Sequence, residues 1–186
     1  PDALVARPLE DAVERIADVM RQVKPHVVLT FDPVGGYYHP DHIRVHEATV
    51  AAFHRVRGEL ANSDPQVLRR LYYHTMPKTS IKAAVLWMRL QGKDPRKAGR
   101  NADIDLVQIA SESFPVHVKV NYRPVLKQRE QAAACHASQG GGQNPFGLSG
   151  VLIRLFNKPI DRFMQGFPEP EPNQPMKHDL FWGLND

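Results

Sequence analysis

The tetrapeptide His-Pro-Asp-His at positions 39–42 carries the side chains of this sequence that are best suited to chemistry. Imidazole nitrogens bind zinc and other late divalent metal ions, and a carboxylate commonly accepts the second ring N–H and fixes the tautomer. His39 and His42 are therefore candidates to face a metal ion, with Asp41 oriented toward a histidine. Because a catalytic zinc ion takes three protein ligands and a water molecule, two histidines provide only part of such a centre.

The sequence around this tetrapeptide predicts that both imidazoles reach the edge of a sheet. The β-branched run 26–31 is bounded by proline and by the sequence DPVGG, which is typical of a buried parallel strand. A helix is expected to start at Pro40 or Asp41, because proline is favoured in a first helical turn. Ligands gather beyond the carboxyl ends of parallel strands, where this loop lies. His46, one turn after His42, is interpreted either as a support for the site or as a surface residue.

The rest of the chain alternates between helical and strand patterns, as in an α/β fold. Apolar residues recur at helical spacing over 9–23 and are expected to lie on one face of a helix. A polar loop at 91–103 is interpreted either as a solvated connection or as a segment that contacts substrate. The further expected elements are strands at 68–76 and 115–120, helices at 80–90 and 122–139, and an irregular tail at 168–175.

The composition predicts one ordinary domain, residues 1–186, which is long enough to bury a core. The formal net charge is +4, with basic residues scattered among acidic ones, so no nucleic-acid partner is expected. No apolar run approaches the roughly 20 residues that span a bilayer, so no membrane partner is expected either. The single cysteine, Cys135, excludes an intrachain disulfide and indicates either a reducing compartment or a protein that is indifferent to redox conditions. We expect a soluble, cytoplasmic protein and leave open whether it forms a homo-oligomer.

The stretch VVLTFDPVGGYYHPDHIRVHEAT, residues 27–49, resembles the second signature of the LmbE/PIG-L-like deacetylases. Members of that family are metal-dependent enzymes that remove N-acetyl groups from N-acetylglucosamine-type sugars. The sequence KQREQAAACHASQ resembles a helix of the family that ends in a His-x-Ser-Gln motif, here residues 136–139. The final HDLFWGL resembles the family's closing strand. The resemblance implies an α/β fold with a Rossmann-like, mostly parallel sheet that is flanked by helices.

The resemblance also implies roles for individual residues. His42 would be a ligand of a divalent metal, with zinc as the expected ion. His39 would stabilise the oxyanion of the tetrahedral intermediate or protonate the leaving amine, and Asp41 would tune His39. Tyr38 stands where a glycine is frequent in the family, so it would alter the freedom of the backbone or narrow the cleft. Tyr37 would reach the substrate carbonyl as a catalytic residue, and the expected contacts with the small sugar substrate come from Tyr37, Tyr38 and Gln139.

The family's first signature, Ala-His-Pro-Asp-Asp-Glu, occurs nowhere in this sequence. In the family it supplies a histidine and an aspartate to the metal and a second aspartate as general base. We therefore expect the chain to be the carboxyl-terminal portion of a longer protein, whose missing amino-terminal segment supplies the opening strands and these groups. The expected activity is zinc-dependent N-deacetylation of an N-acetylglucosamine-type conjugate. Two alternatives stay open, which are a non-catalytic sugar-binding protein of the same fold and a different metal hydrolase.

Overall fold

A computed structural model describes residues 3–99, 102–136 and 159–184 of the chain. Its contacts divide the chain into two compact units, and the tetrapeptide at 39–42 lies within the first. The expectation of a single domain for residues 1–186 stays a prediction. The first unit comprises Pro1–Thr75, Phe114–Lys119 and Arg162–Asp186, and the second comprises Met76–Ser113 and Val120–Asp161.

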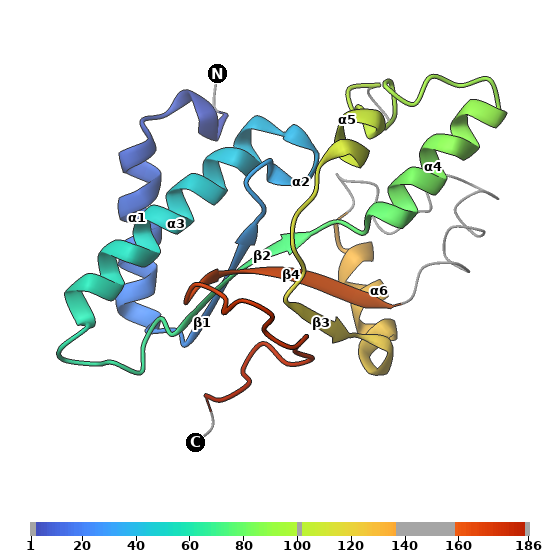
Figure 1. Ribbon diagram of the computed structural model, residues 1–186. Coiled ribbons are helices and arrows are strands. Elements are labelled where there is room, and N and C mark those ends of the chain that lie inside the picture. The colour runs from blue at the N-terminus through green and yellow to red at the C-terminus, as the bar shows by residue number, and fades with distance from the viewer. Residues whose placement is uncertain (1–2, 100–101, 137–158, 185–186) are drawn as a thin grey trace. The chain divides into compact units, whose positions relative to one another are not determined.

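Helices and strands are mixed along the chain (Figure 1), which confirms the expected α/β class. The helices are α1 Leu9–Val23, α2 Gly35–Tyr38, α3 Pro40–Leu60, α4 Lys78–Leu90, α5 Leu106–Ser111 and α6 Leu126–Ala134, with short 3-10 turns η1 Leu4–Ala6 and η2 Arg123–Val125. The strands are β1 Val27–Phe31, β2 Arg70–Thr75, β3 Val118–Asn121 and β4 Ile160–Phe167. In the ranges that the structure describes, no helix has the length and apolar character that crossing a membrane requires.

The strands form one open sheet in the order β1-β2-β4-β3. β1 runs parallel to β2, with Val27 beside Arg70 and Phe31 beside His74, whereas β2 and β4 are antiparallel. The sheet is therefore mixed, and its β1–β2 pair is the parallel part on which the predicted site depends. Because β1 and β2 are parallel, their carboxyl ends lie at the same edge of the sheet.

The core of the first unit lies between its two long helices and the sheet. α1 and α3 lie side by side next to β1 (Figure 1), and side chains from both helices form one buried cluster. Val28 and Leu71 are partners in the β1–β2 register, and both pack into this cluster. The apolar face of α1 is buried at Ala12, Val13, Ala17 and Met20, whereas Val19 and Val23 are 57% and 66% exposed.

Several boundaries and one strand differ from the sequence-based expectations. Residues 178–184 form a turn in place of the expected closing strand, because the Asp179 carboxylate accepts the backbone N–H of Phe181 at 2.9 Å. The helix expected at 122–139 ends at Ala134, and its last residues, 137–139, lie outside the described ranges. Three elements were not predicted, namely α2, α5 and β4.

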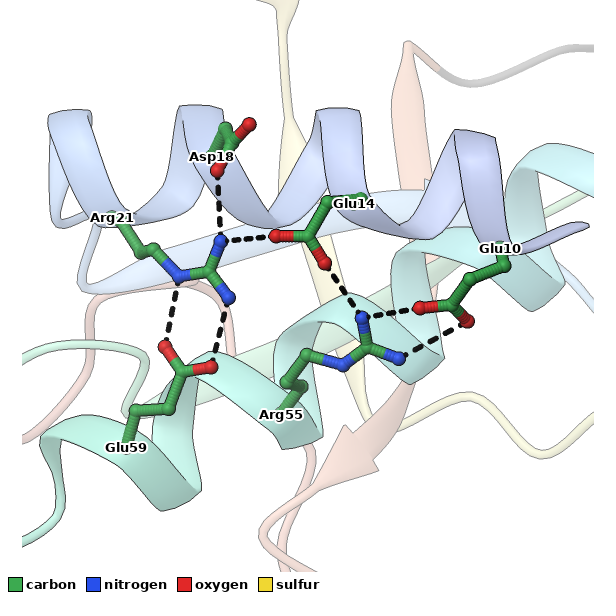
Figure 2. Close-up of polar contacts among 6 residues, drawn as sticks. All are labelled: Glu10, Glu14, Asp18, Arg21, Arg55 and Glu59. Carbon is green, nitrogen blue, oxygen red and sulfur yellow. Dashed lines mark hydrogen bonds and ion pairs between the residues drawn. The ribbon is translucent and has the colours of Figure 1, made fainter.

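A network of ion pairs joins α1 to α3 (Figure 2). Arg21 donates to three carboxylates at 2.6–2.8 Å, and Arg55 donates to two at 2.7 and 2.8 Å. Hydrogen bonds from Arg21 lower the pKa of Glu14 and of Glu59 below their ordinary value of 4.5. The members are Glu10, Glu14, Asp18 and Arg21 on α1, with Arg55 and Glu59 on α3.

Replacing Arg21 with methionine should lower stability modestly at pH 7, because the network is exposed to solvent. A carboxylate whose pKa is lower in the folded state stabilises the fold above its unfolded pKa, and this contribution is lost as pH falls through the folded pKa. The deficit of Arg21→Met should therefore shrink between about pH 5 and pH 3. Urea unfolding of the full-length protein at several pH values measures this, with Arg15→Met as the control. Equal urea midpoints for both variants at pH 7 would contradict a role of the network.

Candidate active site

The loop between β1 and α3 places the predicted residues at the carboxyl end of β1. α3 starts at Pro40, as predicted, and His39 is its N-cap residue. The Nδ1 atom of His39 accepts a hydrogen bond from the backbone N–H of Asp41 at 3.2 Å. This bond satisfies one of the free N–H groups of the first helical turn and fixes the ring at the helix start. Because Nδ1 is the acceptor, the proton of the neutral ring lies on Nε2.

The His42 ring is held by contacts on several sides. Its Nδ1 atom lies 3.2 Å from the carbonyl oxygen of Gly35. The ring stacks on that of Phe31, with centroids 4.1 Å apart and planes at 9°, and the Tyr37 ring meets it edge-on. Since a carbonyl oxygen can only accept, Nδ1 carries the proton and Nε2 keeps its lone pair. This is the tautomer in which an imidazole binds a metal ion through Nε2.

Tyr37, His39 and His42 lie together, as the prediction of a shared site requires. The ring centroids of the two histidines are 4.7 Å apart. The Tyr37 ring lies 5.7 Å from that of His39 and 5.2 Å from that of His42. All three side chains are half-buried, so each keeps a surface that a bound molecule could reach. The roles assigned to them in catalysis and metal binding stay predictions.

Asp41 contacts a different group from the one expected. Its carboxylate accepts a hydrogen bond from the backbone N–H of Val5 at 2.9 Å, which ties η1 to the start of α3. The bond between Asp41 and His39 runs through the backbone N–H of Asp41 and not through its carboxylate. Asp41 therefore positions His39 through its backbone N–H at the helix start. Any residue with a backbone N–H could make the same bond at position 41.

Of the remaining predicted residues, the structure describes Tyr38 and His46 but not Gln139. Tyr38 adopts a left-handed backbone with φ of 67°, a conformation that suits the glycine frequent at this position in the family. Gln139 lies outside the described residues. His46 is half-buried, with its Nδ1 atom 2.8 Å from the carbonyl oxygen of Phe31 and its ring edge-on to that of Tyr73. The half-buried ring does not fit a surface residue, and its role as a support for the site stays a prediction.

Within the described ranges, no group of three or more His, Cys, Asp or Glu side chains is arranged to hold a metal ion. The chemistry of His42 nevertheless fits one position in such a centre. Its Nε2 lone pair is free, and its Nδ1–H is bonded to a backbone carbonyl, which is the usual arrangement of a metal-binding histidine. This part of the chain therefore fits a single imidazole ligand of a zinc or similar ion.

Gly35 and Asp32 shape the loop in ways that the sequence reasoning did not reach, because it treated the Gly-Gly pair only as a source of backbone freedom and gave Asp32 no role. Gly35 has a φ of 62°, and a Cβ atom there would lie 2.8 Å from both the Cβ of His42 and the backbone nitrogen of Ile43. Asp32 is 2% exposed, and its carboxylate accepts backbone N–H groups of the loop. The signal for Asp32 was its place ahead of Pro-Val-Gly-Gly, because aspartate side chains often cap turns.

Gly35→Ala should disrupt the site far more than Gly92→Ala, a matched control. Gly92 has a similar φ of 70°, but nothing lies within 4 Å of a Cβ placed there. Gly92→Ala should lose about 1–2 kcal/mol of stability from the left-handed backbone alone. Gly35→Ala should lose a further 1–3 kcal/mol, roughly, because the new methyl group overlaps the first turn of α3. Thermal unfolding of the full-length variants measures both, and equal losses would show that the close approach is absent.

Comparison with known proteins finds a family model described as PIG-L: GlcNAc-PI de-N-acetylase, which matches residues 1–53. Three similar curated proteins are each named 1D-myo-inositol 2-acetamido-2-deoxy-alpha-D-glucopyranoside deacetylase. The protein of Rhodococcus erythropolis is 52% identical over 194 residues, which cover 100% of this chain and 63% of the relative. The protein of Acidothermus cellulolyticus is 30% identical over 187 residues, covering 100% and 61%. The protein of Saccharomonospora viridis is 30% identical over 185 residues, covering 99% and 63%.

The chain spans about three fifths of the length of these curated relatives. It covers 61% of the Acidothermus cellulolyticus protein and 63% of the Rhodococcus erythropolis protein. The family match covers the loop and the start of α3, which carry the imidazole cluster. The relatives match almost the whole chain, including the second unit. This chain belongs to the PIG-L (LmbE-like) family.

Proposed function

We propose that the protein containing this chain is a metal-dependent hydrolase that removes the N-acetyl group from an N-acetylglucosamine-type conjugate. The observation that carries the proposal is the pair of imidazoles at the start of α3. His42 keeps a lone pair on Nε2, and His39 keeps an N–H donor on Nε2. The printed names of the relatives support a sugar amide as the substrate, with a glycoside of myo-inositol as the first conjugate to test.

The proposed cofactor is a divalent ion, with zinc as the first candidate, held through the Nε2 atom of His42. When bound, such an ion supplies a Lewis acid that polarises an amide carbonyl and activates water. The bond from Nδ1 to the Gly35 carbonyl keeps the His42 ring from turning and leaves the Nε2 lone pair available. We propose that the other ligands and the general base come from polypeptide outside these 186 residues, because the relatives are longer than the matched region.

In this proposal, His39 and Tyr37 stabilise the negative charge that develops on the amide oxygen. Water adds to the carbonyl carbon, the C–N bond breaks, and acetate and a free amine leave. His39 can donate from Nε2 while neutral, since its Nδ1 atom is occupied by the N–H of Asp41. The hydroxyl of Tyr37 is the second proposed donor, and its ring lies 5.7 Å from that of His39. One such donor typically contributes about 3–4 kcal/mol to lowering the barrier.

The wider setting is part of the same proposal. The single cysteine suits a reducing compartment, so we propose a cytoplasmic location. The proposed partner is the small sugar substrate, with neither nucleic acid nor a membrane surface. Tyr38 and Gln139 remain proposed substrate contacts on the basis of the family resemblance. The oligomeric state is left open.

The full-length protein should release acetate from an N-acetylglucosamine conjugate, and a chelator should abolish the release. Adding zinc back should restore it, since the ion supplies the Lewis acid. An acetate assay across inositol, lipid and thiol-bearing conjugates would also define the group that is attached to the sugar. A protein that binds these conjugates but takes up no metal would support the sugar-binding alternative and contradict hydrolysis.

His42 and His39 should respond differently to substitution. His42→Ala should lose bound zinc and activity together. His39→Asn should keep the helix cap, because asparagine is a strong N-cap residue, but remove the Nε2–H donor. It should therefore retain zinc and lose about 10²–10³-fold in kcat. His26→Ala, which changes an exposed histidine at the other end of β1, is the control. A normal kcat in His39→Asn would rule out the donor role.

A further inference from the structure

Asp32 collects the backbone N–H groups of the loop that follows β1. Its Oδ1 atom accepts the N–H of Gly36 at 2.7 Å and that of Val34 at 3.2 Å. Its backbone carbonyl accepts the N–H of Gly35 at 2.9 Å. Three consecutive residues therefore donate to one aspartate, which is 2% exposed. We call this set of three bonds the Asp32 clamp.

The clamp restrains a segment that contains two consecutive glycines. Gly35 and Gly36 both have positive φ, at 62° and 76°, and glycine reaches many other backbone conformations at little cost. A different backbone conformation at either glycine would rotate the Gly35 peptide group and move its carbonyl oxygen away from α3. With the clamp in place, this oxygen lies 3.2 Å from Nδ1 of His42. The direction of one carbonyl group therefore depends on the buried carboxylate.

We infer that Asp32 is a positioning residue that selects which nitrogen of His42 is available to a metal ion. It acts through the Gly35 peptide, whose carbonyl oxygen takes the Nδ1–H and leaves the lone pair on Nε2. The inference rests on the proposed function to the extent that His42 is a ligand there. The selection of the tautomer itself is a property of the chain without metal.

A buried carboxylate beside a metal site could also act directly, as a ligand or as a base. The geometry favours positioning, because the Oδ1 atom of Asp32 already accepts two backbone N–H groups. The two roles differ in what they need from the side chain. A ligand or base needs the negative charge, whereas the clamp needs only an acceptor oxygen, which an asparagine amide also provides.

The test compares Asp32→Asn, Asp32→Ala and Asp105→Ala in the full-length protein. Asp105 caps α5 by accepting the N–H groups of Val107 and Gln108 at 2.8 and 3.0 Å. Asp105→Ala therefore removes two bonds of the same kind within the second unit. Two readouts are needed, namely the His42 tautomer from ring ¹⁵N NMR of the metal-free protein and the zinc affinity from competition with a chelating dye.

Positioning predicts that Asp32→Asn and Asp105→Ala keep the wild-type tautomer and zinc affinity. Asp32→Ala should show a mixture of tautomers and bind zinc about 10–100-fold more weakly. An unchanged tautomer in Asp32→Ala would overturn the inference, as would an equal loss of affinity in Asp32→Asn and Asp32→Ala. If Asp32→Ala does not fold, the result for Asp32→Asn still decides between the two roles. A protein that follows this pattern but releases no acetate would overturn the proposed function and leave the clamp standing.

Discussion

The contact between the carbonyl oxygen of Gly35 and Nδ1 of His42 is the constraint on which the rest of the site depends. It requires the loop to approach α3 so closely that a side chain at position 35 would overlap the helix. It also requires α3 to begin at Pro40, so that His42 lies in the first turn. Each residue of a helix rotates the next side chain by about 100°, so a start shifted by one residue would turn His42 away from the carbonyl. Loop length, glycine content and helix start are therefore fixed together.

Backbone groups also hold two other imidazoles at the start of α3. In His39, His42 and His46 alike, a backbone group lies within hydrogen-bond distance of Nδ1. His39 accepts from an N–H, whereas His42 and His46 each lie beside a carbonyl oxygen. The consequence for Nε2 is opposite, because His39 keeps a proton there and His42 keeps a lone pair. One helix start thus presents an N–H donor on one imidazole and a nitrogen lone pair on another, with ring centroids 4.7 Å apart. Sites on helices hold such geometry more precisely than sites on loops, and the ion pairs to α1 hold this helix in place.

The sequence was sufficient to locate a helix when its position follows from apolar periodicity or from one strong residue preference. Apolar spacing predicted α1, and the preference of proline for a first turn predicted the start of α3. The sequence was insufficient where contacts join residues far apart, as between Asp41 and Val5. The expected closing strand was wrong because Asp179 accepts the backbone N–H of Phe181 in a turn, a side-chain contact that outweighs the strand preference of the aromatic residues. Asp32 was missed because an aspartate ahead of Pro-Val-Gly-Gly predicts a turn but does not reveal which backbone N–H groups the carboxylate accepts.

Tyr38 shows how the loop combines flexibility with strain. Gly35 and Gly36 adopt positive φ without a steric cost, but Tyr38 adopts a φ of 67° with a full side chain. A left-handed backbone costs a non-glycine residue about 1–2 kcal/mol, which a glycine at position 38 would avoid. Such outliers persist where neighbouring contacts over-determine the backbone, and here the Tyr38 N–H donates to the Val34 carbonyl at 2.8 Å. The left-handed backbone at position 38 therefore belongs to the conformation of the whole loop, which a glycine at this position would adopt at lower cost.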